Sequence, residues 1–123
     1  MKDILVGKLS SQLAQSANLA EYVGLKIVQS KGIKKHVEKR HPECIKYLGN
    51  ISSIIKHPDY IGRSPNEDSM SFELVKRIDE CVQIGIRLDK SEEYFFVATL
   101  YVVTEAKVNA RIRSGRLKRI NDK

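Results

Sequence analysis

Val82-Gln83-Ile84-Gly85-Ile86-Arg87-Leu88 alternates apolar residues with other residue types along its whole length. Such alternation is typical of a β-strand that buries one of its two faces. A polar turn follows over residues 89–93, and the β-branched and aromatic run 94–103 indicates the next strand. Together the two runs predict an antiparallel hairpin, around which the rest of the sheet is expected to form.

The faces of this hairpin depend on how the two strands pair. We expect Leu88 to lie opposite Tyr94, which places Ile84 opposite Ala98 on the core side. The opposite side, which we call the outer face, then carries four polar or aromatic side chains. They are Gln83, Arg87, Thr99 and Tyr101.

A third strand is predicted over residues 72–78, joined to the hairpin by a tight turn at Asp79-Glu80. This turn would place Lys76 beside Gln83 on the outer face. A slip of one residue in the pairing would instead turn Lys76 toward the core, because successive side chains of a strand alternate between faces.

The first half of the chain is predicted to be helical. Apolar residues recur at spacings of three and four over residues 33–56, which is a helical period. Pro42 disfavours helical geometry at His41, so we expect a kink or two helices that meet there. The second helix should end before His57-Pro58, and residues 58–71 form a loop. The prediction is an α+β fold with N-terminal helices packed on an antiparallel sheet of about four strands.

Length and composition fit one domain over residues 1–123, in which residues 1–24 are an N-terminal extension of unassigned structure. The formal charge of +7 favours a polyanionic partner such as nucleic acid, although ordinary surface solubility explains it equally well. The basic segment 107–119 could follow a phosphate backbone, or it could be a solvated tail or a final edge strand.

Several functional classes lose support. Cys44 and Cys81 lack CxxC spacing and lie in apolar stretches, so buried thiols are expected rather than a disulfide or a zinc site. There is no acidic cluster at metal-ligand spacing and no glycine-rich phosphate loop, so no metal or cofactor is expected. No apolar run approaches the roughly 20 residues that span a bilayer. We therefore expect a cytoplasmic protein without a membrane partner.

Two of the three histidines lie in one basic segment, which reads His-Val-Glu-Lys-Arg-His-Pro over residues 36–42. Histidine exchanges protons near neutral pH, and neighbouring cations can hold a phosphate beside it. His36 and Arg40 are four residues apart and share a helix face. His41 lies nearer the apolar stripe, where a histidine is more often structural, and His57 fits a helix C-cap.

In order along the chain, these motifs resemble the phage-associated PBECR nuclease domains, which are similar to barnase, EndoU, colicin and RelE ribonucleases. The resemblance runs from about Leu25 to the end. The motifs that carry it are His-Val-Glu-Lys-Arg-His-Pro-Glu (36–43), Ile-Ile-Lys-His-Pro-Asp-Tyr-Ile-Gly (54–62), Glu-Leu-Val-Lys (73–76), Ala-Thr-Leu-Tyr (98–101) and Ser-Gly-Arg (114–116).

The resemblance implies a BECR-type fold and a metal-independent ribonuclease, a kind of enzyme often deployed as a toxin. It also implies that His36 or His41 meets Lys76, Thr99 and Tyr101 across a cleft that Arg116 completes. His36 would act as general base or acid with His41 as its partner or positioner. Lys76 and Arg116 would hold the phosphate, and Thr99 and Tyr101 would donate hydrogen bonds to it or to the sugar. Further cations that could contact substrate are Lys39, Arg40, Arg63, Arg87 and Lys118.

Three functions remain open at this point. The first is an endoribonuclease, toxin-like or phage-derived, that acts on RNA such as tRNA and is inhibited by an acidic antitoxin or immunity protein. The second is a non-catalytic RNA-binding module of the same fold. The third is a protein-interaction or phage accessory domain whose basic face meets an acidic partner.

Overall fold

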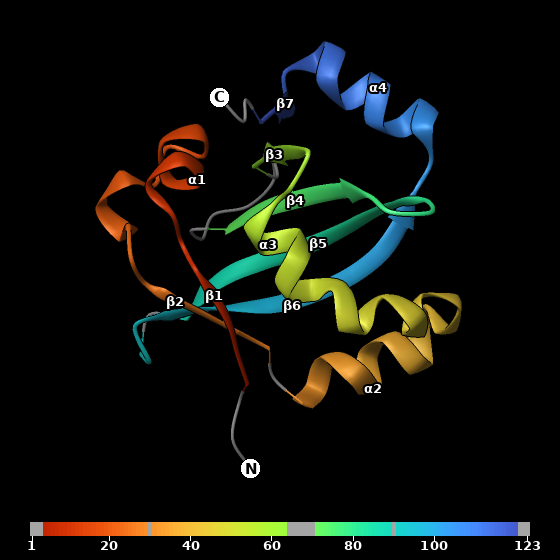
Figure 1. The fold of residues 1–123 in the computed structure, drawn as a ribbon, viewed down its shortest axis with the longest axis horizontal. Helices are drawn as coiled ribbons and strands as arrows, with labels where there is room; N and C mark the ends of the chain where they lie inside the picture. Colours follow the sequence, from red (N-terminus) through yellow and green to blue (C-terminus); the bar gives the residue numbers. More distant parts are fainter. Residues whose placement is uncertain (1–3, 30, 64–70, 90, 121–123) are drawn as a thin grey trace.

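The computed structural model describes residues 4–29, 31–63, 71–89 and 91–120. They form a seven-stranded sheet in the order β1-β2-β6-β5-β4-β3-β7 (Figure 1). The strands are β1 (Ile4–Lys8), β2 (Lys26–Gln29), β3 (Tyr60–Gly62), β4 (Ser71–Arg77), β5 (Cys81–Asp89), β6 (Tyr94–Val103) and β7 (Leu117–Arg119). The helices are α1 (Ser11–Ser16), η1 (Ala20–Tyr22), α2 (Lys31–Arg40), η2 (Pro42–Asn50), α3 (Ile51–Lys56) and α4 (Glu105–Ser114), of which η1 and η2 are 3₁₀-helices.

The fold is α+β, as predicted, but the sheet is larger than expected. The central strands β6, β5, β4 and β3 are antiparallel neighbours. β7 extends this sheet antiparallel to β3, and β2 pairs with β6 in parallel orientation. The prediction of about four antiparallel strands was therefore too small, because short strands extend the sheet at both edges.

The predicted pairing of β5 with β6 was wrong in register, and it was right in faces only toward Ile84. Near Leu88 the error is one residue, so the buried Phe95 and Val97 face the core in place of Tyr94 and Ala98. Leu88 lies opposite Phe95, and Ile84 lies opposite Leu100. A bulge shifts the pairing between Gly85 and Ile86, where Ala98 is the extra residue on β6. Toward Ile84 the error is two residues, and a shift of two leaves every side chain on its original face. Gln83, Arg87, Thr99 and Tyr101 accordingly share the outer face.

The predicted place of Lys76 was wrong. β4 pairs with β5 so that Val75, and not Lys76, lies opposite Gln83. This slip of one residue puts Lys76 on the opposite face of the sheet, where its Nζ donates a hydrogen bond of 2.7 Å to the carbonyl oxygen of His57. Lys76 is thus separated by the sheet from the outer face.

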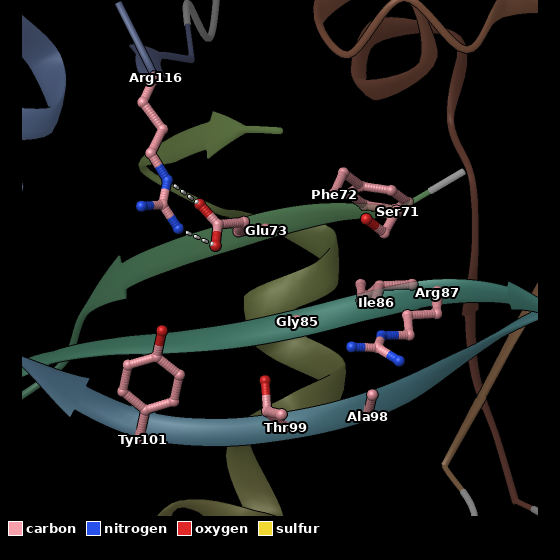
Figure 2. A pocket seen from close by; sticks show the side chains of 10 residues that line it. All are labelled: Ser71, Phe72, Glu73, Gly85, Ile86, Arg87, Ala98, Thr99, Tyr101 and Arg116. Atoms are coloured by element: carbon pink, nitrogen blue, oxygen red, sulfur yellow. Dashed lines mark hydrogen bonds and ion pairs between the residues drawn. The ribbon is translucent and has the colours of Figure 1, made fainter. Parts of the chain in front are cut away.

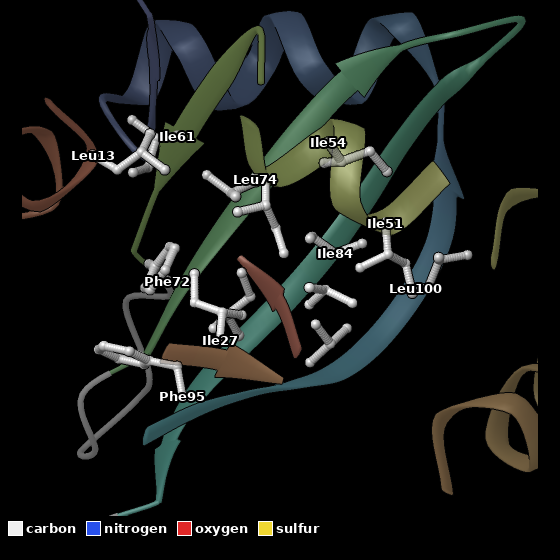
Figure 3. Packing of buried hydrophobic residues seen from close by; sticks show 14 of the residues in the cluster. Leu13, Ile27, Ile51, Ile54, Ile61, Phe72, Leu74, Ile84, Phe95 and Leu100 are labelled. Atoms are coloured by element: carbon white, nitrogen blue, oxygen red, sulfur yellow. The ribbon is translucent and has the colours of Figure 1, made fainter. Parts of the chain in front are cut away.

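The main core lies between the sheet and α1, α2, η2 and α3 (Figure 3). Ile51 and Ile54 of α3 pack with Leu74 and Ile84 of the sheet, and all four side chains are almost fully buried. The break predicted at His41-Pro42 is confirmed, since α2 ends at Arg40 and η2 begins at Pro42. α3 ends at Lys56, before His57-Pro58, also as predicted.

The helix α4 covers part of the outer face, where a basic tail or an edge strand was expected. Thr104 caps its first turn by accepting a hydrogen bond of 3.1 Å from the Lys107 amide, and Gly115 ends it with a left-handed φ of 87°. Val108 packs with Val75 and other residues in a second, smaller core. The prediction of N-terminal helices therefore left out this C-terminal helix.

Two further segments differ from expectation. β3 lies within the predicted loop 58–71, whose residues 64–70 fall outside the described residues. In the N-terminal extension, β1 pairs antiparallel with β2, and Leu13 and Ala14 of α1 join the main core. None of the helices in the described part of the chain has the length and apolar character needed to cross a membrane.

Candidate functional site

A buried carboxylate marks the outer face of the sheet. Glu73 of β4 is only 7% exposed, and Arg116, which follows α4, holds it with two hydrogen bonds (Figure 2). Arg116 Nε donates to Oε1 at 3.0 Å, and Nη2 donates to Oε2 at 2.8 Å. Hydrogen bonding to the carboxylate raises the pKa of Arg116, so its guanidinium stays charged. The pair compensates two charges that would be costly to bury alone.

Gln83 connects this ion pair to its neighbours. Its Nε2 donates to Glu73 Oε2 at 3.1 Å and lies 2.6 Å from the Tyr101 hydroxyl oxygen. Its Oε1 accepts a hydrogen bond of 2.7 Å from Arg111 Nη1 of α4. The amide is 1% exposed, so its orientation is fixed by these contacts. One network therefore joins three strands, α4 and the segment before β7.

His41 reaches this network from the side. Its ring lies roughly parallel to that of Tyr101, with 5.7 Å between the ring centroids. The break between α2 and η2 fixes its backbone, because its amide donates to the Val37 carbonyl and its carbonyl accepts from the Cys44 amide. β2 pairs with β6 only near Phe95, which leaves the far half of β6 open to α2.

His36 lies one ring further away. Its ring centroid is 6.0 Å from that of His41, and it is half-buried on α2. Of the two histidines, His41 is therefore the one in contact with the outer-face network, although the sequence favoured His36 for proton transfer.

A hollow of about 230 Å³ lies beside this network on the outer face (Figure 2). Arg87 and Thr99 border it, as expected from their position on the sheet. Its lining residues are Ser71, Phe72, Glu73, Gly85, Ile86, Arg87, Ala98, Thr99, Tyr101 and Arg116.

Arg116 also lines two depressions that contain further cations. Arg63, Arg116 and Lys118 line a depression of about 370 Å³, and Arg63, Arg111 and Arg116 line another of about 650 Å³. Arg63 Nη1 also donates to the Ala17 carbonyl at 2.9 Å. Positive charge is thus concentrated around Arg116.

The remaining predicted cations lie elsewhere. Lys39 and Arg40 are exposed in the last turn of α2. His57 is the exposed C-cap of α3 on the face opposite the network. Within the described ranges, no three His, Cys, Asp or Glu residues are grouped so that they could hold a metal ion.

Sequence reasoning missed Glu73, Gln83 and Arg111 as site residues. Glu73 and Gln83 are polar residues within strongly apolar strands, and a carboxylate between Phe72 and Leu74 was the available signal. Arg111 gave no such signal, because it is one of many cations in its segment.

The family model of the phage-Barnase-EndoU-ColicinE5/D-RelE like nuclease 3 group, PBECR3, matches residues 4–110 of the chain. The chain belongs to this family. Because PBECR3 is a family of nuclease domains, membership indicates a nuclease function for this chain. No curated protein and no solved structure matches it.

The extent of the match bears on two assignments. It begins at residue 4, so the family pattern includes β1 and α1, whereas the sequence resemblance began at about Leu25. It ends at residue 110, before Arg111 and Arg116. The place of Arg116 in the site consequently rests on its hydrogen bonds to Glu73.

Proposed function

We propose that this PBECR3 domain is a metal-independent endoribonuclease whose reaction centre is the network of Glu73, Tyr101 and Arg116 together with His41. The observation that carries the proposal is that a buried carboxylate, a guanidinium and a phenol from separate elements line one hollow, with the imidazole of His41 stacked against the phenol ring. Family membership supplies the nuclease class.

RNA contains its own nucleophile, so these groups suffice. A base takes the proton of the 2'-hydroxyl, O2' attacks phosphorus, and the P–O5' bond breaks as an acid protonates O5'. The products are a 2',3'-cyclic phosphate and a 5'-hydroxyl. We assign Glu73 as the base and His41 as the acid, with Arg116 stabilising the negative charge that develops on the phosphoryl oxygens.

The ion pair between Glu73 and Arg116 suggests how substrate enters the site. A phosphate offers a guanidinium the same two-oxygen geometry as a carboxylate. When a phosphate takes over Arg116, the Glu73 carboxylate loses its cation and becomes available for the 2'-hydroxyl. Tyr101 and Thr99 would donate hydrogen bonds to the phosphate or the sugar.

Histidine substitutions test the chemistry. RNA incubated with the protein in EDTA should yield 2',3'-cyclic phosphate ends, and His41→Ala should lower the rate by about 10²–10⁴-fold. His57→Ala, on the other side of the sheet, serves as the matched control and should cleave like the wild type. His36→Ala should have the smaller effect expected of a group that positions His41. Cleavage that requires a divalent metal, or that survives His41→Ala, would contradict the proposal.

We propose that the protein acts as a toxin-like ribonuclease in the cytoplasm and that tRNA is one of its candidate substrates. The charge of +7 and the cations around Arg116 would suit an acidic antitoxin or immunity protein as well as RNA. Expression should then be toxic, and co-expression of an acidic inhibitor should relieve it. Salt-sensitive RNA binding without any cleavage would instead indicate a non-catalytic RNA-binding module.

A further inference from the structure

One end of the outer-face hollow contains a buried hydroxyl without a partner. Ser71 of β4 is 5% exposed, and its Oγ forms no hydrogen bond with any residue in the described ranges. The side chain lines the hollow, as Figure 2 shows. Buried polar atoms in proteins are almost always hydrogen-bonded, so an orphaned hydroxyl in a hollow suggests that a ligand supplies the partner.

The hollow is kept open by the absence of a side chain at Gly85, which lies opposite Glu73 on β4 and Thr99 on β6, one step along the sheet from Ser71. A Cβ at this position would lie 2.6 Å from Thr99 Oγ1, and the neighbouring residue of the bulge, Ala98, is small. The volume of about 230 Å³ is below the roughly 300–1,000 Å³ of pockets for drug-sized ligands. This space suits one flat ring rather than a large cofactor.

The open end lies next to the proposed reaction centre. Ser71 and Glu73 are two residues apart on β4 and point to the same face, which is a step of about 7 Å along a strand. Thr99 is level with Glu73, because both residues lie opposite Gly85. A nucleotide whose phosphate lies at Arg116 would therefore bring its own base, or the base of its neighbour, to this end.

We propose that Ser71, Gly85 and Thr99 form a subsite for the nucleobase next to the scissile phosphate. The inference rests on the proposed function, since it takes the Glu73–Arg116 end as the phosphate site. The two hydroxyls can donate to or accept from the edge of a base, and the bare backbone at Gly85 gives its ring room against the sheet. The exposed Arg87 borders the rim of this subsite.

Binding of small probes to the full chain tests the subsite without any cleavage. The probes are the four nucleoside 3'-monophosphates and ribose 5-phosphate, which has the phosphate and sugar but no base. At least one mononucleotide should bind about tenfold or more tightly than ribose 5-phosphate. Ser71→Ala should remove most of this preference and leave the affinity for ribose 5-phosphate unchanged.

Two further variants complete the design. Gly85→Ala should also reduce the preference for a base, because its methyl group would occupy the hollow. Ser71→Ala is expected to fold like the wild type, since the oxygen that it removes has no hydrogen-bond partner in the described part of the protein. Lys76→Ala, on the other face, should bind every probe like the wild type.

The outcomes separate this inference from the proposed function. Equal affinity for ribose 5-phosphate and all four mononucleotides, or a preference that survives both variants, would overturn the base subsite and leave a second phosphate site as the alternative. A protein that binds bases here but does not cleave RNA in EDTA would contradict the nuclease mechanism and retain the subsite.

Discussion

Glu73 is the residue on which the account of the site depends. A buried ion pair is seldom the most stable use of such positions, because apolar residues of similar volume often stabilise a fold as well or better. The place of Glu73 among Gln83, Tyr101 and Arg116 is therefore better explained by a role in the reaction than by a contribution to the stability of the fold. No sequence pattern predicted this role, since neither periodicity nor spacing indicates which polar residue of a strand will meet a cation from a segment 43 residues away.

Tyr47 allows a prediction about pH that does not depend on function. Burial, together with a hydrogen bond of 2.9 Å from its hydroxyl to Glu80, raises the pKa of Tyr47 to about 12. An unfolded tyrosine loses its proton near pH 10. Between these values the unfolded state binds fewer protons than the native state, so this group's contribution to stability is full below pH 10 and falls as pH rises toward 12.

The comparison with Tyr47→Phe isolates this effect. Denaturant unfolding at several pH values from 8 to 11 should show a constant difference in the free energy of unfolding up to about pH 9. Above that, the wild type should lose stability relative to the variant. A difference that is independent of pH over this range would contradict the assigned environment of Tyr47.

At the scale of elements, the strands and breaks that follow from side-chain alternation or from a proline were predictable. The alternation in 82–88 gave β5, and the proline at position 42 gave the break between α2 and η2. The bulge at Ala98 was not predictable, because one extra residue leaves the alternation on each side intact. α4 was missed because its apolar residues are sparse, although Thr104 and Gly115 are ordinary helix-capping signals.

The contact between β3 and β7 supports a prediction at this scale. A Cβ at Gly62 would clash with the backbone oxygen of Arg116, so Gly62→Ala must displace the segment that carries Arg116. We expect a loss of about 2–3 kcal/mol in the free energy of unfolding, together with a lower rate of RNA cleavage.

Gly49→Ala is the matched control for this substitution. Gly49 lies in η2, and a Cβ there would meet no atom within 4 Å. Its stability and cleavage rate should stay close to those of the wild type, as measured by denaturant unfolding and by the RNA assay. If Gly62→Ala were as stable and active as Gly49→Ala, the close approach of β3 to Arg116 would be wrong.

At the scale of the whole molecule, the sheet separates a helical core from the face that carries the site. The sequence placed Thr99 and Tyr101 on the correct face, but it placed Lys76 with them because the turn at residues 79–80 was taken one residue out of register. A turn of uncertain length decides the face of a whole strand. Register therefore limited the prediction of the site more than the prediction of the elements did.

The positive charge around Arg116 predicts how RNA binding responds to salt. The logarithm of the affinity for a single-stranded RNA should fall linearly with the logarithm of salt concentration, by about 0.7 for each phosphate neutralised. Lys118→Ala should lower this slope by about 0.7 if Lys118 contacts one phosphate. Lys56→Ala, an exposed cation at the end of α3, should leave the slope unchanged.

The most direct test of the account compares Glu73→Gln with Lys76→Ala in RNA cleavage. The two residues are close together on β4 but lie on opposite faces of the sheet. In EDTA, with folding checked by circular dichroism, Glu73→Gln should lower kcat/KM by about 10²–10⁴-fold, because it removes the proposed base. Lys76→Ala should stay within about threefold of the wild type, since Lys76 lies on the other face of the sheet and takes no part in the proposed mechanism. A large loss in Lys76→Ala with full activity in Glu73→Gln would contradict the placement of the reaction centre on the outer face.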